Sequence, residues 1–186
     1  TTPITFSATA SSVLMNNLKL NLIDINYENY TLDLNKLEDK VKRNRKIKLI
    51  LGVDYGGQPC DWPSLNYIKN KYDLFLINDN CHAMGSRIEN SNTYAAKYAD
   101  IVTQSYHPVK NFTTGEGGSI LTNSKKIFDF CQLHRSHGMN KSKILTNNNG
   151  RWFYKIDNYG YNYRITDFQC ALGVSQLKKL EKFVIK

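Results

Sequence analysis

Lys110 is the first candidate for a reactive side chain in this sequence. It follows an apolar run that we expect to form a strand, and Pro108 stiffens its approach. The glycines at 115, 117 and 118 let backbone come close to it. A lysine held away from water has a lowered pKa, and its amine then becomes a nucleophile toward a carbonyl. We therefore predict a Schiff-base lysine at this position.

Asp79 comes at the end of a second apolar run and would be a carboxylate in a half-dry crevice. Such a group needs a cationic or protonated partner. A pyridinium nitrogen is one, and a Schiff-base lysine with an aspartate on the pyridinium is the pattern expected for pyridoxal phosphate (PLP). His82 could bind the ring oxygen, and Ser105 could donate its hydroxyl to the phosphate. The plainer alternatives are a capping aspartate, a structural histidine and a strand-end serine.

Other kinds of site fit the sequence badly. The run Gly115-Glu116-Gly117-Gly118 lacks the G-x-G-x-x-G spacing, and there is no G-x-x-x-x-G-K-[ST] motif. We predict no catalytic metal, since neither H-E-x-x-H nor a Cys/His cluster occurs. Cys81 and His82 are sequence neighbours that would not face each other as nucleophile and base. The four cysteines (60, 81, 131 and 170) are widely spaced and are expected to be reduced thiols in a cytoplasmic protein.

The elements that must position these residues alternate between helix and strand. Patterning predicts helices at 6–16, 33–43, 62–72, 125–134 and from 167 onward, and strands at 20–25, 47–53, 74–77, 101–105 and 119–121. Residues 1–6 resemble the exit of a strand, and 140–159 an exposed loop. This order indicates an α/β fold with a mostly parallel sheet. Functional groups collect at the carboxyl ends of such strands, where Asp54, Asp79 and the 105–110 segment lie.

Length and charge narrow the choice of partners. A chain of 186 residues can bury one substantial core, so one domain is the default. The net charge of +9 invites a nucleic-acid partner, but the charge is spread and its densest cluster, at 40–48, has a helical pattern. An anionic small substrate explains it as well. No apolar run approaches a membrane span and no signal peptide is visible. We expect neither a nucleic-acid nor a membrane partner.

The segment Ser-Tyr-His-Pro-Val-Lys-Asn-Phe-Thr-Thr-Gly-Glu-Gly-Gly, at 105–118, resembles the catalytic segment of the DegT/DnrJ/EryC1/StrS nucleotide-sugar aminotransferases, which are fold-type I PLP enzymes. Residues 78–86, 135–139 and 160–164 are similar to three further landmarks of that family. The resemblance implies the large domain of that fold, a three-layer αβα structure. The His-Pro-Val-Lys and Arg-Ser-His-Gly-Met variants are most similar to the UDP-4-amino-4,6-dideoxy-N-acetyl-altrosamine transaminase branch, which aminates C4 of a UDP-4-keto-6-deoxy-N-acetylhexosamine.

The resemblance also assigns roles at the cofactor. Lys110 would carry PLP and shuttle protons, and Asp79 would pair with the pyridinium nitrogen. His82, where many members have Gln, would contact the ring hydroxyl, and Ser105 would bind the phosphate. Phe6 would stack on the ring.

Three more residues are carried over or left open. Asn162 would reach the phosphate of the neighbouring subunit's cofactor, which implies a homodimer with shared active sites. His107 and Arg164 are candidates for the amino donor's carboxylate, although His107 could only line the strand end and Arg164 only pin a loop.

The activity that the resemblance implies is transfer of an amino group from an amino acid, by resemblance glutamate, to a keto sugar nucleotide, for surface-glycan or nonulosonic acid biosynthesis. Two alternatives stay open: a non-catalytic or regulatory sugar-nucleotide-binding relative, and a PLP-dependent sugar dehydratase, although dehydratases carry His where this chain has Lys110. Asn78 and Asn80 replace residues that are more often acidic or small, so pairing around Asp79 could differ.

We expect residues 1–186 to be the large domain of a longer protein, truncated before Thr1 and without the small C-terminal domain. The family's Gly-Thr phosphate-binding turn would then precede Thr1. This chain alone should bind cofactor poorly and should not turn over.

Overall fold

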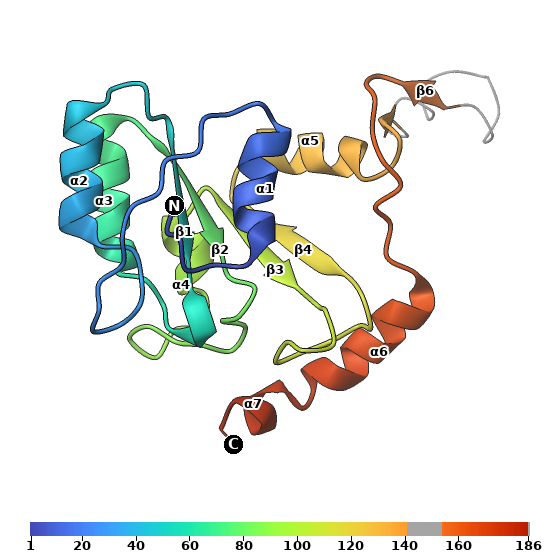
Figure 1. The fold of residues 1–186 in the computed structure, drawn as a ribbon. Coiled ribbons are helices and arrows are strands. Elements are labelled where there is room, and N and C mark those ends of the chain that lie inside the picture. Colours follow the sequence, from blue (N-terminus) through green and yellow to red (C-terminus); the bar gives the residue numbers. More distant parts are fainter. Residues whose placement is uncertain (141–153, 186) are drawn as a thin grey trace.

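A computed structural model describes residues 1–140 and 154–185 of the chain (Figure 1). Its centre is a four-stranded sheet in the order β1-β2-β3-β4. The first three strands are parallel and the fourth runs antiparallel to β3. The strands are β1 (Leu49–Val53), β2 (Phe75–Asp79), β3 (Ile101–Ser105) and β4 (Gly118–Leu121). The predicted α/β fold with a mostly parallel sheet is confirmed.

Helices precede or follow most strands, and several begin at a capping side chain. Asp33, Asp61 and Ser124 each accept a hydrogen bond from a backbone N–H three residues later, which satisfies one of the free donors at a helix start. The helices are α1 (Ser7–Met15), α2 (Leu34–Arg43), α3 (Trp62–Tyr72), α4 (Tyr94–Tyr98), α5 (Lys125–His134), α6 (Asp167–Leu177) and α7 (Leu180–Val184), with a 3₁₀ turn at Tyr55–Gly57 and a small strand pair, β5 (Met139–Asn140) and β6 (Lys155–Ile156).

The core lies between the sheet and the α2, α3 and α4 side of the molecule (Figure 1). Trp62 and Leu65 of α3 and Leu76 and Val102 of the sheet have no exposed surface. Gly52 of β1 faces the Trp62 ring, and a Cβ added there would lie 2.9 Å from that ring. A glycine is therefore required for α3 to approach the sheet this closely.

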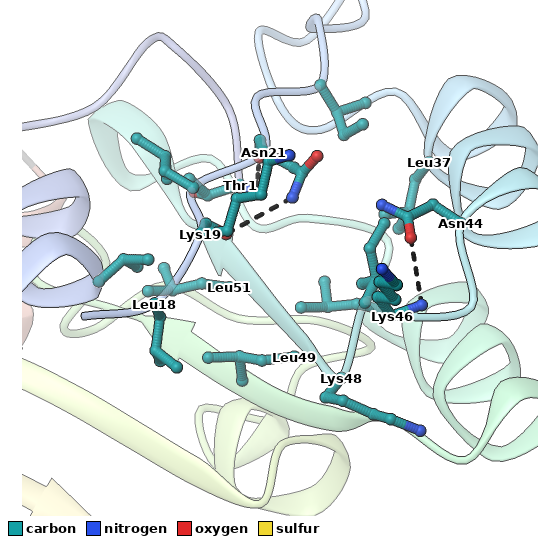
Figure 2. A pocket seen from close by; sticks show the side chains of 15 residues that line it. Thr1, Leu18, Lys19, Asn21, Leu37, Asn44, Lys46, Lys48, Leu49 and Leu51 are labelled. Atoms are coloured by element: carbon teal, nitrogen blue, oxygen red, sulfur yellow. Dashed lines mark hydrogen bonds between the residues drawn. The ribbon is translucent and has the colours of Figure 1, made fainter. Parts of the chain in front are cut away.

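The strand predicted at 20–25 is wrong. Its only ladder contact is an isolated bridge between Ile25 and Leu32. The segment passes beside β1 without pairing, and Figure 2 shows an apolar hollow between Leu18 and the side chains of Leu49 and Leu51. The alternation of apolar and polar residues predicted a strand. A strand also needs a neighbouring strand to pair with, and among the described residues this segment has none.

The C-terminal helix is also different from the prediction, because it breaks after Leu177 and resumes at Leu180. The second piece, α7, packs on the loop that follows β2: a Cβ at Gly85 would lie 2.7 Å from Val184, and Arg87 pairs with Glu181 at 2.9 Å. These contacts redirect the chain, which periodicity cannot foresee.

Smaller differences concern the ends of the chain. Residues 1–6 form bends and no strand, and the predicted loop at 140–159 contributes one edge residue of β5 and all of β6. The rest of that prediction, at 141–153, lies outside the described residues. Helix α4 was not predicted.

Candidate active site

At the end of the parallel sheet, successive side chains of each strand lie on opposite faces. In the register of β2 and β3, Asp79 is paired with Thr103, and Ser105 lies two residues further along β3. Side chains alternate along a strand, so Asp79 and Ser105 share one face, while Asn78 and Asn80 point to the other. The α1 helix covers the Asp79 face, because its Thr9 hydroxyl donates to Asp79 Oδ2 at 2.8 Å.

The Asp79 carboxylate is held by neutral donors alone. Besides the Thr9 hydroxyl, the backbone N–H of Cys81 donates to Oδ1 at 3.2 Å. Among the described residues, no lysine, arginine or histidine forms an ion pair with this carboxylate. A partly buried anion without a cation is a fitting partner for a protonated ring nitrogen. The residues present therefore suit a pyridinium group.

Lys110 lies in the loop after β3, which is tied to the loop after β2. The side chain of Asn111 donates to the carbonyl of Met84 at 3.1 Å and to that of His82 at 3.5 Å. The Lys110 N–H donates to the carbonyl of His107 at 3.0 Å, which makes the tight turn that presents the lysine. The Lys110 ammonium lowers the pKa of both His82 and Cys81, whereas Asp79 raises both. The charges of Lys110 and Asp79 therefore affect the pKa values of the same two residues, His82 and Cys81, in opposite directions.

His82 is fixed in one tautomer. The Gly56 N–H donates to its Nδ1 at 3.3 Å, and the Tyr55 ring lies edge-on, with ring centres 5.8 Å apart. Since Nδ1 accepts, the neutral ring carries its proton on Nε2. Burial is the largest cause that lowers the pKa of His82, followed by the charge of Lys110. A neutral His82 can therefore donate a hydrogen bond from Nε2.

Ser105 and His107 are linked by a local turn. The Ser105 hydroxyl accepts from the His107 N–H at 3.3 Å. The His107 ring accepts from the Val109 N–H at Nδ1, also at 3.3 Å, and its Nε2 lies 3.8 Å from the Glu116 carboxylate. His107 is thus directed toward a carboxylate of its own loop.

Phe6 is the N-cap residue of α1, and its ring is 68% exposed. It stands three residues before Thr9, close in sequence to the contact with Asp79.

The structure does not bring Asn162 and Arg164 to Lys110. Asn162 forms a bridge with Ser136, and the segment around it lies beside the end of α5, at the right of Figure 1. Arg164 lines a hollow with Ser136, Met139 and Tyr154. Both are exposed, so their predicted roles depend on groups that this chain does not hold next to Lys110.

Sequence reasoning missed three contributors: Thr9, Asn111 and the buried polar contacts of Asp54. Thr9 stands among small residues of α1, but nothing in the sequence indicated its hydrogen bond to Asp79. Asp54 was noted only as a strand-end residue. In residues 1–140 and 154–185, no group of three or more histidine, cysteine or acidic residues could hold a metal ion, and no helix is long and apolar enough to cross a membrane.

Comparison with known proteins gives the family. The model of the DegT/DnrJ/EryC1/StrS aminotransferase family matches residues 1–186. The chain belongs to this family. A relative in Campylobacter jejuni, a UDP-4-amino-4,6-dideoxy-N-acetyl-beta-L-altrosamine transaminase, is 38% identical over 182 residues, which cover 97% of this chain and 46% of the relative.

Solved structures of sugar aminotransferases share the fold of this family member. Helicobacter pylori PseC, an aminotransferase involved in the biosynthesis of pseudoaminic acid, superposes with a TM-score of 0.86 at 32% identity, over 96% of this chain and 45% of that one. The PLP form of the sugar aminotransferase Spr1654 from Streptococcus pneumoniae gives a TM-score of 0.82 at 26% identity, over 96% and 48%. The chain spans about half the length of the relatives it matches.

Proposed function

We propose that this chain is the PLP-binding part of an aminotransferase that moves an amino group from an amino acid, by resemblance glutamate, to a 4-keto-6-deoxy nucleotide sugar. Family membership over residues 1–186 supports the reaction class, and the names of the relatives support the sugar nucleotide. The observation that carries the proposal is that Asn111 ties the loop of Lys110 to the carbonyls of His82 and Met84, in the loop that follows Asp79 at the end of β2.

The described residues would divide the work as follows. Asp79, bound only by neutral donors, would hold a proton on the ring nitrogen. His82 would donate from Nε2 to the ring oxygen, and Ser105 would donate its hydroxyl to the phosphate. Phe6 would cover the ring face on the α1 side. The chemistry that PLP supplies when bound is an aldehyde that condenses with amines and a ring that accepts electrons.

Lys110 would do the proton transfer. Its amine would be the covalent attachment point and, once free, would take a proton from the substrate carbon and return it at the neighbouring position. The hydrogen bonds of Asn111 hold the lysine loop against the loop after β2, which follows Asp79 and contains His82.

The finer parts of the proposal concern the assembly and the compartment. We propose a homodimer in which Asn162 reaches the partner's cofactor phosphate, because Asn162 is exposed and lies apart from Lys110 in its own chain. His107 and Arg164 remain the proposed ligands of the donor carboxylate. We propose that residues 1–186 belong to the large domain and that the complete enzyme is cytoplasmic.

Reductive trapping tests the proposal. The complete protein is incubated with PLP, treated with borohydride and digested, and the modified peptide is mapped by mass spectrometry. We expect the label on Lys110 and its loss in Lys110→Ala, while the matched variant Lys97→Ala keeps it. A label on a different lysine, or none, would reject the proposal. The trapped label also separates an aminotransferase from the dehydratase alternative, because a dehydratase with His at this position has no lysine there to trap.

A further inference from the structure

Asp54 is a buried carboxylate that the proposed reaction leaves unused. It follows β1 directly and has no exposed surface. Among the described residues, five neutral groups donate hydrogen bonds to it: Cys60 N at 2.9 Å, Trp62 Nε1 at 2.9 Å, Asn78 Nδ2 at 3.1 Å, Asn80 Nδ2 at 2.8 Å and Tyr94 Oη at 2.9 Å. Burial raises the pKa of Asp54, and these hydrogen bonds oppose the rise. Without a cation, the carboxylate depends on all of its donors, which fixes their places in turn.

Two of these donors are the neighbours of Asp79 on either side. Asn78 and Asn80 both donate to Asp54 Oδ2, and the Asp54 N–H donates to the carbonyl of Asp79 at 3.0 Å. In the part of the chain that the structure describes, Asn78 Oδ1 is buried without a partner, so Asp54 alone orients that side chain. Three consecutive residues at the end of β2 are thus bound to one residue.

The network continues to the strand that carries Ser105. The side chain of Gln104 donates to Asn80 Oδ1 at 3.3 Å and accepts from the Ser119 hydroxyl at 3.1 Å. Gln104 immediately precedes Ser105, as Asn78 precedes Asp79. Because side chains alternate, the buried network occupies one face of the strand ends and the two proposed cofactor ligands occupy the other.

We propose that Asp54 is a positioning residue: by binding Asn78, Asn80 and the backbone of Asp79, it sets the orientation in which Asp79 meets the ring nitrogen of PLP. The inference rests on the proposed function, since it concerns the ligand of that same site. It also explains the amides at 78 and 80, which are the donors that a carboxylate at 54 requires.

The test measures the state of the ring nitrogen instead of turnover. The complete protein is loaded with PLP labelled with nitrogen-15 in the ring, and the chemical shift and the dissociation constant of PLP are measured at one fixed pH. Asp79→Asn gives the reference shift for a ring without its acid. We expect Asp54→Asn and Asn80→Ala to move the shift toward that reference and to weaken PLP about tenfold, the factor for one hydrogen bond to a charged group.

Tyr94→Phe is the matched control. On the helix side it removes a donor to the same Asp54 oxygen, and with it the second acceptor of Asn80, but it leaves Asn78 and Asn80 donating to Asp54. It should lower stability in urea about as much as Asn80→Ala without moving the nitrogen shift. Equal shifts in Tyr94→Phe and Asn80→Ala, or an unchanged shift in Asp54→Asn, would overturn the inference. If Asp54→Asn fails to fold, the comparison of the nitrogen shifts in Asn80→Ala and Tyr94→Phe still tests the inference. Failure of the wild type to bind PLP would instead reject the proposed function itself.

Discussion

The Thr9 hydroxyl donates to the Asp79 carboxylate at 2.8 Å and so joins α1 to the end of β2 across 70 positions in the sequence. Thr9 is buried, and the Thr5 hydroxyl lies 2.7 Å from it in turn. A hydrogen bond to a charged group in a dry setting is among the stronger ones in a protein. The first helix therefore takes part in holding the acid of the proposed site.

Replacing Thr9 by valine should weaken PLP binding by about tenfold, because Asp79 loses one of two hydrogen bonds and its orientation loosens. The measurement is an absorbance titration of the complete apo-protein with PLP. Thr9→Ser keeps the hydroxyl and should keep most of the affinity. Thr5→Val, one hydrogen bond further from Asp79, is the matched control; an equal loss there would show that the effect is general loosening of α1.

The imidazole of His82 should titrate below its ordinary pKa of about 6.5. Burial and the Lys110 ammonium lower this pKa, and Asp79 raises it. Lys110→Ala should therefore move the pKa up, and Asp79→Asn should move it further down. Proton–nitrogen correlation spectra of the four histidine rings measure these values directly. Shifts of the same sign in the two variants would contradict the placement of His82 between the two charges.

The lowered pKa of His82 also determines how the stability of the protein changes with pH. Because the unfolded chain binds the His82 proton more readily than the folded one, the free energy of unfolding should fall as the pH drops below about 6.5. His82→Asn should flatten this part of the curve, measured by urea denaturation of the apo-protein. His137→Asn is the control and should leave the slope in place, because His137 is exposed and asparagine tolerates its positive φ.

The thiol of Cys81 should be slow to alkylate, since burial, with help from Asp79, raises its pKa to about 12. Asp79→Asn should speed its reaction with iodoacetamide at pH 8, because a negative neighbour of the thiolate is removed. Lys110→Ala should slow it. Mass spectrometry of the apo-protein gives the rate for each cysteine separately. A Cys81 that reacts equally fast in all three proteins would contradict the charge arrangement.

Gly118→Ala should destabilise the end of the sheet by about 1–3 kcal/mol. An added Cβ would lie 2.5 Å from the carbonyl oxygen of Gln104, so β4 would have to move away from β3 where it pairs with Ser105. Gly115→Ala is the contrast, because its Cβ would meet nothing within 4 Å and its cost comes only from a φ of +80°. Urea denaturation measures both, and PLP affinity should fall more in Gly118→Ala.

The sequence by itself determined most of the elements and indicated the residues that we propose to be reactive. A lysine beside a proline and a glycine run, an aspartate after a buried strand, and helix caps such as Asp33 and Thr166 are local signals, because propensity, capping and turn chemistry act over a few residues. Those signals predicted helix 62–72 and strand 101–105 to the residue, but they ended the strand before Asp79 at residue 77, whereas β2 runs to Asp79.

Tertiary structure decided what those residues meet. Residues far apart in the chain come together in four features of the fold. These are the pairing of the strands, the packing of α7 on Gly85, the hydrogen bond from Thr9 to Asp79 and the donors around Asp54. Such contacts depend on register and on packing between elements, and neither leaves a periodic trace in the sequence. For the same reason, the alternating run at 20–25 does not pair as a strand. The role of the amides beside Asp79, as donors to Asp54, is likewise visible only in the folded structure.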